Sequence, residues 1–405
     1  MELVSGIVLI AALLFLLAGG IWIAISLFIA SFLVLQFVLG VPAGLILATS
    51  MWGFMDNWTL TALPLFILMG ELLFRSDISK QIFEALAPVV GRVPGGLLHV
   101  NVLGSGLFAA VSGSSTATTV TIGKMTLPEL RARGYDDRMA IGSLAASGTF
   151  GLLIPPSTML IIYGFIAEVS IAKLFVAGIL PGILLLCLFS AYVGADALVR
   201  GRRPAPDPAS EGMSLGQKLV GLTKILPLLL LIAFIMTAMY GGWATATEAA
   251  ALGVVGALVM LFLNGHLTLK LVEEAMLAAT RTTCMIMFIL VAAAYATAAM
   301  GFSRLPANLA TWVATFDLAP WQLIAALTLI YIFLGLFLDG ISMVVLTAAT
   351  VLPMLQAAGI DLIWFGIFIV FVVEMSLITP PVGLNLFALQ TFTGKDSFFI
   401  ARCAA

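Results

Sequence analysis

Long apolar runs separated by short polar turns dominate the chain, and most approach the length of a membrane-spanning helix. Because an α-helix rises about 1.5 Å per residue, roughly 20 apolar residues cross the hydrocarbon core of a bilayer. Residues 40–58 carry Trp52 and Trp58 and are expected to lie at the interface, where tryptophan is enriched. Residues 264–282 are expected to form an amphipathic arm. Full spans are expected at 2–18, 21–39, 59–74, 171–199, 225–240, 248–263 and 283–300.

Four further apolar segments are interrupted by polar residues, glycine or proline. In the first half, 94–127 is interrupted at 111–116 and 139–168 between 147 and 157. In the second half, 320–356 is interrupted at 339–342 and 362–389 between 376 and 385. Non-helical backbone in a bilayer is tolerated only where it lines a cavity or is buried in protein. We therefore expect two re-entrant hairpins and two broken transmembrane helices that line a cavity.

The interruptions lie in a stretch that the chain contains twice. A shift of 225 positions places Leu127-Pro128 on Leu352-Pro353 and Pro155-Pro156 on Pro380-Pro381, with no gap between the pairs. Repeated halves in a hydrophobic chain are typical of transporters. The expected domains are a first repeat at 1–200, a linker at 201–224 and a second repeat at 225–405. The last span of the first repeat, 171–199, would have its counterpart beginning near Asp396, so a final span of roughly 20 residues is expected to be missing from the second repeat.

Composition and charge support a protein that has lipid as its solvent. Hydrophobic residues make up 62% of the 405 positions and charged residues only 9%, too few to cover a soluble surface. With the N-terminus outside, all of the 18 Lys and Arg except Lys173 and Arg304 fall on the cytoplasmic side, and the two hairpins enter from opposite sides. The two halves are therefore expected to be inverted repeats. The net charge of −2 indicates no nucleic-acid partner, and three cysteines and two histidines form no metal motif.

The interruptions bring together groups that suit a small cation and an anion. Alkali ions prefer hard oxygen ligands, and helix N-termini present partial positive charge to anions. Other interpretations remain open: a Ser/Gly cluster is commonly a helix-packing face, Asp339 could simply cap a helix, and Glu71 and Glu374 could be hydrogen-bonded within the packing. The candidate oxygens are those of Ser112, Ser114, Ser115, Thr149, Ser157, Asp339, Ser342, Thr379 and Asn385.

The motifs at these interruptions resemble a known family. Residues 111–117 (VSGSSTA), Leu127-Pro128-Glu129-Leu130 and the stretch from Gly148 to Ser157 are similar to the large membrane subunit, of DctM type, of tripartite ATP-independent periplasmic (TRAP) transporters. Gly335-x-x-x-Asp339-Gly340 and residues 378–385 (ITPPVGLN) fit its second half. The resemblance extends nearly from end to end.

The resemblance implies an all-α polytopic inner-membrane protein with a scaffold and a mobile elevator transport domain. It implies sodium-coupled uptake of an organic acid such as a C4-dicarboxylate or a sialic acid, with sodium ions and no organic cofactor. The implied partners are a small four-helix membrane subunit of DctQ type and a soluble periplasmic binding protein of DctP type. Implied sodium-site residues are Ser112, Gly113, Ser114, Ser115, Gly148, Thr149, Pro155, Asp339, Gly340, Ser342, Thr379 and Gly383. Implied substrate contacts are Ser114, Ser115, Ser157, Thr379 and Asn385.

Three other functions differ from this one in testable ways. A single-component sodium/anion symporter of the same superfamily would transport without a binding protein. A channel would conduct current, although inverted halves with breaks in both favour alternating access. An intramembrane enzyme is disfavoured because the acidic residues do not pair at catalytic spacing. The chain also has no Walker loop, so we expect neither ATPase nor other enzyme activity.

Overall fold

The computed structural model describes residues 2–201, 213–315, 319–336, 338–380 and 383–404, which form helices and turns without a strand. The first half supplies α1 (Glu2–Ala18), α2 (Ile23–Leu33), η1 (Val34–Val38), α3 (Ala43–Met55), η2 (Trp58–Thr61), α4 (Ala62–Phe74), α5 (Ile78–Val90), α6 (Leu98–Ser112), α7 (Ser115–Ala132), α8 (Asp137–Ser147), η3 (Gly148–Leu152), α9 (Thr158–Ile166) and α10 (Ile171–Val199). The second half supplies α11 (Leu215–Leu222), η4 (Thr223–Ile225), α12 (Leu226–Tyr240), α13 (Ala246–Leu263), α14 (Leu269–Phe302), α15 (Leu305–Ala314), α16 (Pro320–Gly335), α17 (Gly340–Ala357), α18 (Leu362–Leu377), α19 (Leu384–Thr393) and α20 (Ser397–Ala404).

Helix boundaries recur at the spacing of the sequence repeat. Adding 225 to the bounds of α7, Ser115–Ala132, gives those of α17, Gly340–Ala357. The helix after each also begins at matching positions, Asp137 in α8 and Leu362 in α18. The intervening glycines Gly134 and Gly359 both have positive φ, of 72° and 68°, which glycine adopts without strain. The repeat therefore specifies the same helix–turn–helix geometry twice.

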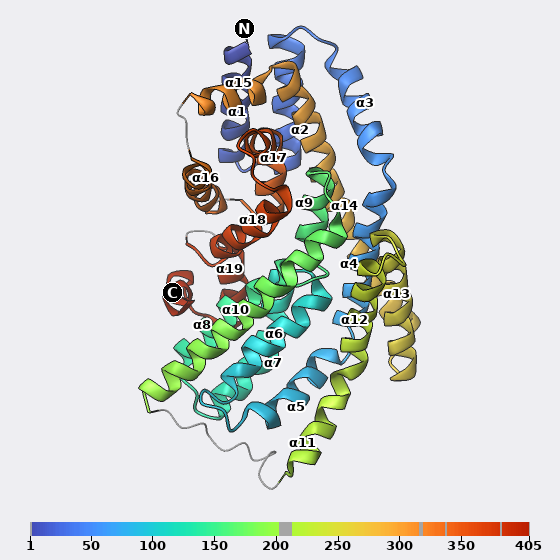
Figure 1. Cartoon of the computed structure of the whole chain (residues 1–405), viewed down its shortest axis with the longest axis vertical. Coiled ribbons are helices and arrows are strands. Elements are labelled where there is room, and N and C mark those ends of the chain that lie inside the picture. Colours follow the sequence, from blue (N-terminus) through green and yellow to red (C-terminus); the bar gives the residue numbers. More distant parts are fainter. Residues whose placement is uncertain (1, 202–212, 316–318, 337, 381–382, 405) are drawn as a thin grey trace.

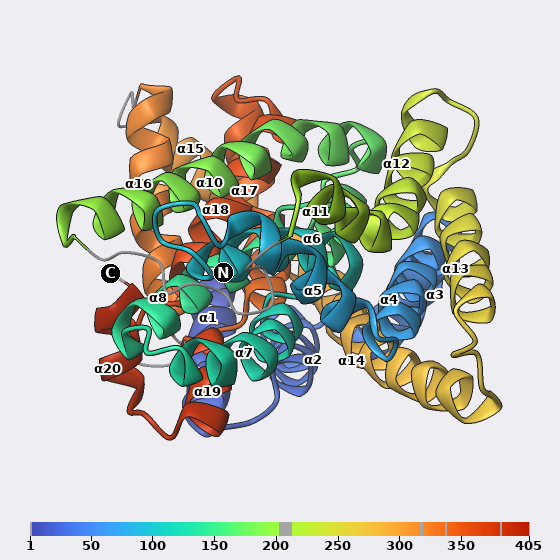
Figure 2. The ribbon, with the colours of Figure 1, turned by 90° about the horizontal axis from the view of Figure 1, so that it is seen from below.

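The helices pack in two groups. In the first, α4 packs against α13 and α14, and α14 also packs against α2 and α3. In the second, α6, α7 and η3 pack on one another, α8 packs against α20, and α17 against α18. Contacts of α4 with α6 and α9, and of α14 with α17, join the two groups. Figure 1 shows α3, α4, α12 and α13 along one side and α8, α16, α18 and α19 on the other, and Figure 2 shows α4 beside α13 from below.

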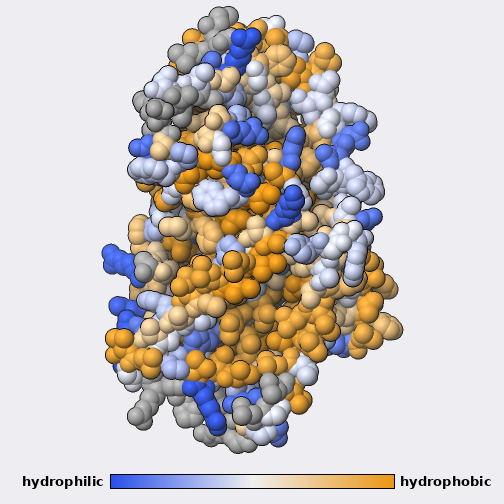
Figure 3. Space-filling model, viewed as in Figure 1, coloured by the Kyte–Doolittle hydropathy of each residue, from blue (hydrophilic) through white to orange (hydrophobic). Residues whose placement is uncertain are grey.

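Several helices have the length and composition of membrane spans. Within the described residues five qualify, the longest being Leu269–Phe302, and the pair α3 and η2–α4, bent by 63°, qualifies as a sixth. Large apolar side chains on these helices face outward, such as Leu180, Phe262 and Leu263, each about three-quarters exposed. Hydrophobic residues accordingly cover broad areas of the surface in Figure 3. Such a surface requires a lipid environment, so the chain is a multi-pass membrane protein.

Three segments that were expected to lie at the interface or to link the repeats contain helices. Residues 269–282 of the expected arm 264–282 belong to α14, which continues from Leu269 to Phe302 without a break. Residues 40–58, expected at the interface, contain the apolar helix α3. The expected linker 201–224 contains α11, which begins with a capping box of Ser214 and Gln217. Residues 202–212 of this linker lie outside the described part of the chain. A Ser-x-x-Gln pattern favours a helix start even in a polar segment.

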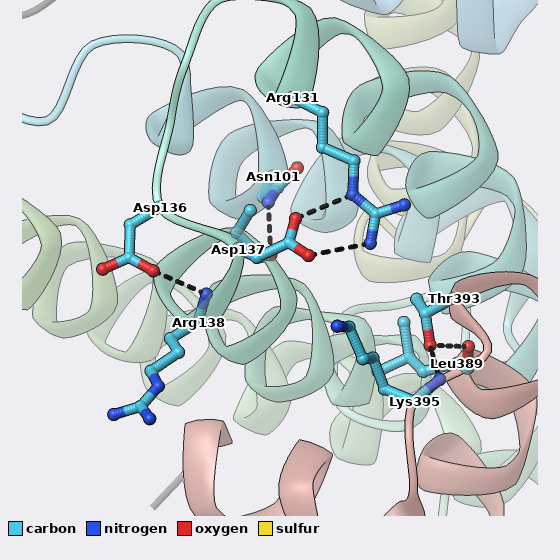
Figure 4. A network of polar contacts seen from close by, with 9 residues as sticks. Asn101, Arg131, Asp136, Asp137, Arg138, Leu389, Thr393 and Lys395 are labelled. Carbon is cyan, nitrogen blue, oxygen red and sulfur yellow. Dashed lines mark hydrogen bonds and ion pairs between the residues drawn. The ribbon is translucent and has the colours of Figure 1, made fainter.

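The turn between α7 and α8 is held by charged and polar contacts, seen in Figure 4. Arg131 donates to both carboxylate oxygens of Asp137, from Nε at 2.7 Å and from Nη2 at 3.0 Å. The hydrogen bond from Arg131 to Asp137 raises the pKa of the guanidinium above its ordinary value. Asp136 accepts from the backbone N of Arg138 at 2.9 Å and so caps α8. This end of the α7–α8 pair is fixed by pairing, whereas the opposite end of α7 carries the break at Gly113.

Candidate functional site

A cavity of about 480 Å³ lies where the two helix groups meet, and both predicted hairpin tips line it. We call it the central cavity. The first tip contributes residues 112–117, and the second tip contributes Asp339, Gly340 and Ile341. The opposite wall consists of residues of α4 and α14. Two interruptions that are more than 200 positions apart in the sequence thus share one cavity.

The first tip is a sharp reversal between two helices. Helix α6 ends at Ser112, and Gly113 adopts the left-handed conformation with φ of 57°, which favours glycine. Ser114 is extended, and its side chain accepts from the backbone N of Ala117 at 3.4 Å, capping α7. The backbone O of Ser114 accepts from Thr118 Oγ1 at 2.8 Å and from Ser112 Oγ at 3.2 Å. Hydroxyls and carbonyls therefore concentrate within one turn.

The first tip packs directly on the first broken span. Ser115 Oγ donates to the backbone O of Gly148 at 3.1 Å, and Thr158 Oγ1 donates to that of Gly113 at 2.7 Å. At Gly151 an added Cβ would lie 2.5 Å from the carbonyl carbon of Ser114. Only glycine permits backbone to approach backbone so closely. The tip and the break form one unit.

The second tip has a related local structure. Asp339 caps α17 by accepting from the backbone N of Ser342 at 3.2 Å, and the Ser342 hydroxyl donates to the same carboxylate. Ser114 and Asp339 occupy equivalent repeat positions, 225 apart, and both cap the helix that follows. At Gly340 an added Cβ would lie 2.4 Å from a methyl of Val373, so this tip packs tightly on α18.

A hydrogen bond between the two halves reaches the first tip. Asn385, in α19, is fully buried and its Nδ2 donates to Ser115 Oγ at 2.7 Å. Its Oδ1 is also buried and has no hydrogen-bond partner. Leaving a buried acceptor unpaired costs about 1–3 kcal/mol. A hard cation coordinated by this oxygen would remove that cost, and oxygen is the ligand type that sodium prefers.

Four helix N-termini face the central cavity. Its lining includes Ser115, Thr158, Gly340 and Leu384, the first residues of α7, α9, α17 and α19. A helix N-terminus presents unpaired N–H groups and roughly half a positive charge. Convergent N-termini of this kind are suited to a carboxylate or another anion.

The opposite wall of the central cavity is largely apolar. Helix α4 contributes Ile67 and Phe74, and α14 contributes Met285, Ile286 and Ile289. The two sides approach closely at Gly70 of α4, where an added Cβ would lie 2.8 Å from the backbone O of Val111.

One charged network interrupts this wall. Glu71 lines the central cavity, and its Oε2 lies 3.5 Å from Nε of Arg75. Arg75 also donates from Nη1 to Glu274 of α14 at 3.2 Å. Arg75 thereby connects the cavity wall to the N-terminal part of α14.

The structure brings some of the predicted site residues into the cavity and leaves others behind it. Those lining it are Ser112, Gly113, Ser114, Ser115, Asp339 and Gly340. Three further predicted residues lie behind the lining and are hydrogen-bonded to lining residues: Gly148, Ser342 and Asn385.

The remaining predicted residues do not line the central cavity. Thr149 donates to the backbone O of Ala146 at 2.8 Å, and Ser157 caps α9. Pro155 is buried beside Ser157, and Gly383, with φ of 43°, precedes α19. Thr379 lines a different cavity, of about 360 Å³, against α20. Pro381 of the second Pro-Pro pair lies outside the described residues.

Sequence reasoning missed the apolar wall and Thr158. The wall carries no polar signal, since Ile67 and Ile286 look like ordinary membrane-helix residues. Thr158 follows the capping residue Ser157, and its contact with Gly113 depends on tertiary packing. Of the intramembrane acids, Glu71 lines the cavity, whereas Glu374 is buried in α18 with its Oε1 unpartnered.

Comparison with known sequences gives consistent matches over most of the chain. Residues 10–399 match the family described as tripartite ATP-independent periplasmic transporter, DctM component. The chain is 33% identical over 359 residues to the C4-dicarboxylate TRAP transporter large permease protein DctM of Pseudomonas aeruginosa, covering 88% of this chain and 83% of that protein. It is 32% identical over 349 residues to the sialic acid TRAP transporter large permease protein SiaM of Vibrio cholerae, covering 85% and 79%.

Solved structures resemble the fold at low sequence identity. The YdaH transporter of Alcanivorax borkumensis aligns with a TM-score of 0.63 at 15% identity, covering 88% of this chain and 83% of that one. MtrF of Neisseria gonorrhoeae aligns with a TM-score of 0.51 at 14% identity, covering 88% and 81%. At such identities the likeness concerns the helical architecture alone.

Proposed function

The chain belongs to the DctM component family of the tripartite ATP-independent periplasmic transporters, and from this premise we propose that it takes up an organic acid by sodium-coupled secondary transport. The observation that carries the proposal is the central cavity, where four helix N-termini and the oxygens of two helix interruptions converge. The N-termini suit the carboxylate of the substrate, and the oxygens around Ser115 and Asn385 suit sodium. A C4-dicarboxylate, a sialic acid or another carboxylate would satisfy this chemistry.

Sodium coupling follows from the charges that must cross the membrane together. An isolated anion is costly to transfer through a low-dielectric medium, and a bound cation offsets that cost. Entry of sodium is driven by its gradient and by the membrane potential, worth about 2.3 kcal/mol per charge per 100 mV. A site loaded with sodium and carboxylate is therefore nearer to neutral than one loaded with either alone.

The movement proposed for the cycle is an elevator. Both tips and both broken helices pack on one another, whereas the facing wall from α4 and α14 is mostly apolar. A group with its own internal hydrogen bonds, such as Asn385 to Ser115, can move as a rigid body against such a wall. Helices α4, α13 and α14 would serve as the scaffold against which this group moves.

The partners and the location belong to the same proposal. Relatives of the chain are named large permease proteins of TRAP transporters. We accordingly assign the chain to the bacterial inner membrane, with a small four-helix subunit on the scaffold and a periplasmic binding protein that delivers the substrate.

Transport in proteoliposomes tests the proposal. With both partner proteins present, an inward sodium gradient should drive uptake of a carboxylate substrate, and replacement of sodium by potassium or choline should abolish it. Uptake that persists without sodium would contradict the coupling. Equal uptake without the binding protein would identify a single-component symporter, and single-channel currents would identify a channel.

A further inference from the structure

Six hydroxyl side chains line the central cavity, and they differ in whether the protein itself already uses them. They are those of Ser112, Ser114, Ser115, Thr116, Thr158 and Thr282. The three serines and Thr158 take part in hydrogen bonds that shape the first tip. The hydroxyls of Thr116 and Thr282 form no hydrogen bond within the described part of the chain. Among the described lining residues, these two hydroxyls are therefore fully available to a bound solute.

Thr282 faces the cavity because of its position on α14. Met285, Ile286 and Ile289 line the same cavity and follow Thr282 by three, four and seven residues. At about 3.6 residues per turn, this spacing places all four side chains on one face of the helix. Thr283 lies about 100° further round the helix, outside the lining, and its hydroxyl is buried without a hydrogen-bond partner. The α14 side of the mainly apolar wall thus offers the Thr282 hydroxyl to a solute.

Thr116 lies on the tip side of the cavity, in the first turn of α7. Ser114 caps this helix, so Thr116 is its second residue, and its side chain is exposed. The backbone N–H groups of a first turn have no partner within their own helix and carry the positive end of its dipole. The Thr116 hydroxyl adds a donor to the N-terminus that suits the carboxylate.

A threonine hydroxyl suits more than one polar group. It can donate to a carboxylate, and it can donate to or accept from another hydroxyl. Relatives of the chain are named for C4-dicarboxylates and for sialic acid. A C4-dicarboxylate has a second carboxylate, and a sialic acid has a hydroxylated ring. Both classes therefore carry polar oxygens beyond the carboxylate that the helix N-termini suit.

We propose that Thr116 and Thr282 are substrate contacts, one on each side of the central cavity. The inference rests on the proposed function and adds two residues to its substrate site. The substrate carboxylate lies at the N-terminus of α7 beside Thr116, and Thr282 hydrogen-bonds an oxygen at the far end of the substrate. Because α14 belongs to the scaffold of the proposed elevator, the Thr282 contact holds the substrate only in this conformation of the moving group.

Replacement of each threonine by valine tests the contacts, because valine has nearly the same shape and lacks the hydroxyl. Succinate and N-acetylneuraminate, a sialic acid, are the probes, titrated calorimetrically into the purified chain in sodium-containing buffer. For the probe that the native chain binds more tightly, Thr116→Val and Thr282→Val should each raise the dissociation constant about threefold or more.

Two neighbouring threonines supply matched controls on the same helices. Thr121 of α7 and Thr283 of α14 have buried hydroxyls without a hydrogen-bond partner, and neither lines the cavity. Thr121→Val and Thr283→Val should therefore bind the probe as the native chain does. A loss of affinity in these controls as large as in Thr116→Val and Thr282→Val would contradict a direct contact.

Sodium binding without substrate separates a contact from a general disturbance of the fold. Titration with sodium chloride in choline-containing buffer should give the native sodium affinity for Thr116→Val and Thr282→Val. A fall in sodium affinity that matches the fall in probe affinity would overturn the proposal.

The remaining outcomes separate this inference from the proposed function. Native probe affinity in both Thr116→Val and Thr282→Val would refute the two contacts and leave sodium-coupled carboxylate transport intact. If neither probe binds the native chain more tightly in sodium than in choline, with native thermal stability retained, the proposed function fails and the inference fails with it.

Discussion

At each hairpin tip one side chain begins the following helix, and its chemistry differs between the halves. Ser114 caps α7 with a neutral hydroxyl, whereas Asp339 caps α17 with a carboxylate. An acidic cap interacts more favourably with the helix dipole, but it also lowers the positive potential that the helix offers to an anion. The positive end of α7 is therefore offset less by its cap than the positive end of α17.

Gly151 offers the sharpest residue-scale prediction. In Gly151→Ala the new Cβ would lie 2.5 Å from the carbonyl carbon and oxygen of Ser114, both backbone atoms, so the first tip must move. Overpacking of this kind costs about 1–3 kcal/mol. We expect sodium-dependent substrate uptake to fall at least about tenfold, measured as initial rates in proteoliposomes.

Gly44→Ala is the matched control. Gly44 lies in α3 with ordinary φ, and an added Cβ would meet no atom within 4 Å. Its uptake rate should stay close to that of the native chain. Uptake by Gly151→Ala at the control rate would show that the contact between the first tip and the broken span can relax without consequence.

At the scale of elements, the two repeats differ where α3 and α4 of the first correspond to the single helix α14 of the second. Shifted by 225, α3 and α4 fall on the two ends of α14, yet the first repeat bends by 63° where the second is continuous. The bend lies at Asp56-Asn57, where Asn57 caps the next helical segment by accepting from Thr59 N at 3.0 Å. The equivalent residues Arg281 and Thr282 have no such cap and continue the helix.

A salt bridge joins α5 of the first repeat to η4, at the junction between the repeats. Nζ of Lys224 donates to Glu84 at 2.7 Å, and this hydrogen bond lowers the pKa of Glu84 below its ordinary value of 4.5. A lowered folded-state pKa adds stability above the unfolded pKa, which is lost as the pH falls through the folded value. Because both side chains are partly exposed, the contribution is below about 1 kcal/mol.

Thermal unfolding of Lys224→Met in detergent tests this bridge. The variant should melt slightly below the native chain at pH 7, by no more than a few degrees, and the difference should disappear as the pH falls below the lowered pKa of Glu84. Lys80→Met serves as a comparison, because Lys80 lies 4.0 Å from Glu84 and should contribute less. A difference that grows on acidification would contradict the sign of the linkage.

For the whole molecule, two cavities lie along α14. The central cavity meets its residues 282–289, and a second cavity of about 820 Å³ meets its residues 290–298. The second cavity is also lined by α3, η2, the end of α9, and Val345 of α17. The interface between the two helix groups is therefore hollow on both sides of its middle.

Cysteine labelling tests whether these cavities open to opposite sides. Thr282 and Thr297 are separated along α14 by about 22 Å. In a chain lacking Cys187, Cys284 and Cys403, an impermeant maleimide should label Thr282→Cys from the cytoplasmic face and Thr297→Cys from the external face. Vesicles of both orientations supply the comparison. Labelling of both positions from one face would rule out this arrangement.

The sequence by itself determined the helices, the repeat and the places where helices are interrupted. A membrane helix satisfies its backbone hydrogen bonds within its own segment. Composition, length and the positions of glycine and proline therefore specify such a helix locally. The interruptions at Gly113 and Asp339 were readable for that reason, as was the equivalence of α7 and α17. The continuity of α14 was not predicted, because charged residues such as Lys270 and Glu274 indicate an interfacial face but do not show where a helix ends.

Only the tertiary structure decided which interruptions meet and what faces them. The hydrogen bond from Asn385 to Ser115 joins residues 270 positions apart, and no local pattern encodes it. Thr379 carries a hydroxyl as Ser114 does, yet it lines another cavity. The type of a side chain does not determine which cavity it faces. In a membrane protein, apolar side chains face lipid, packed protein or a cavity with no difference in their sequence. The place of Ile67 and Ile286 in the cavity wall therefore depends on packing alone.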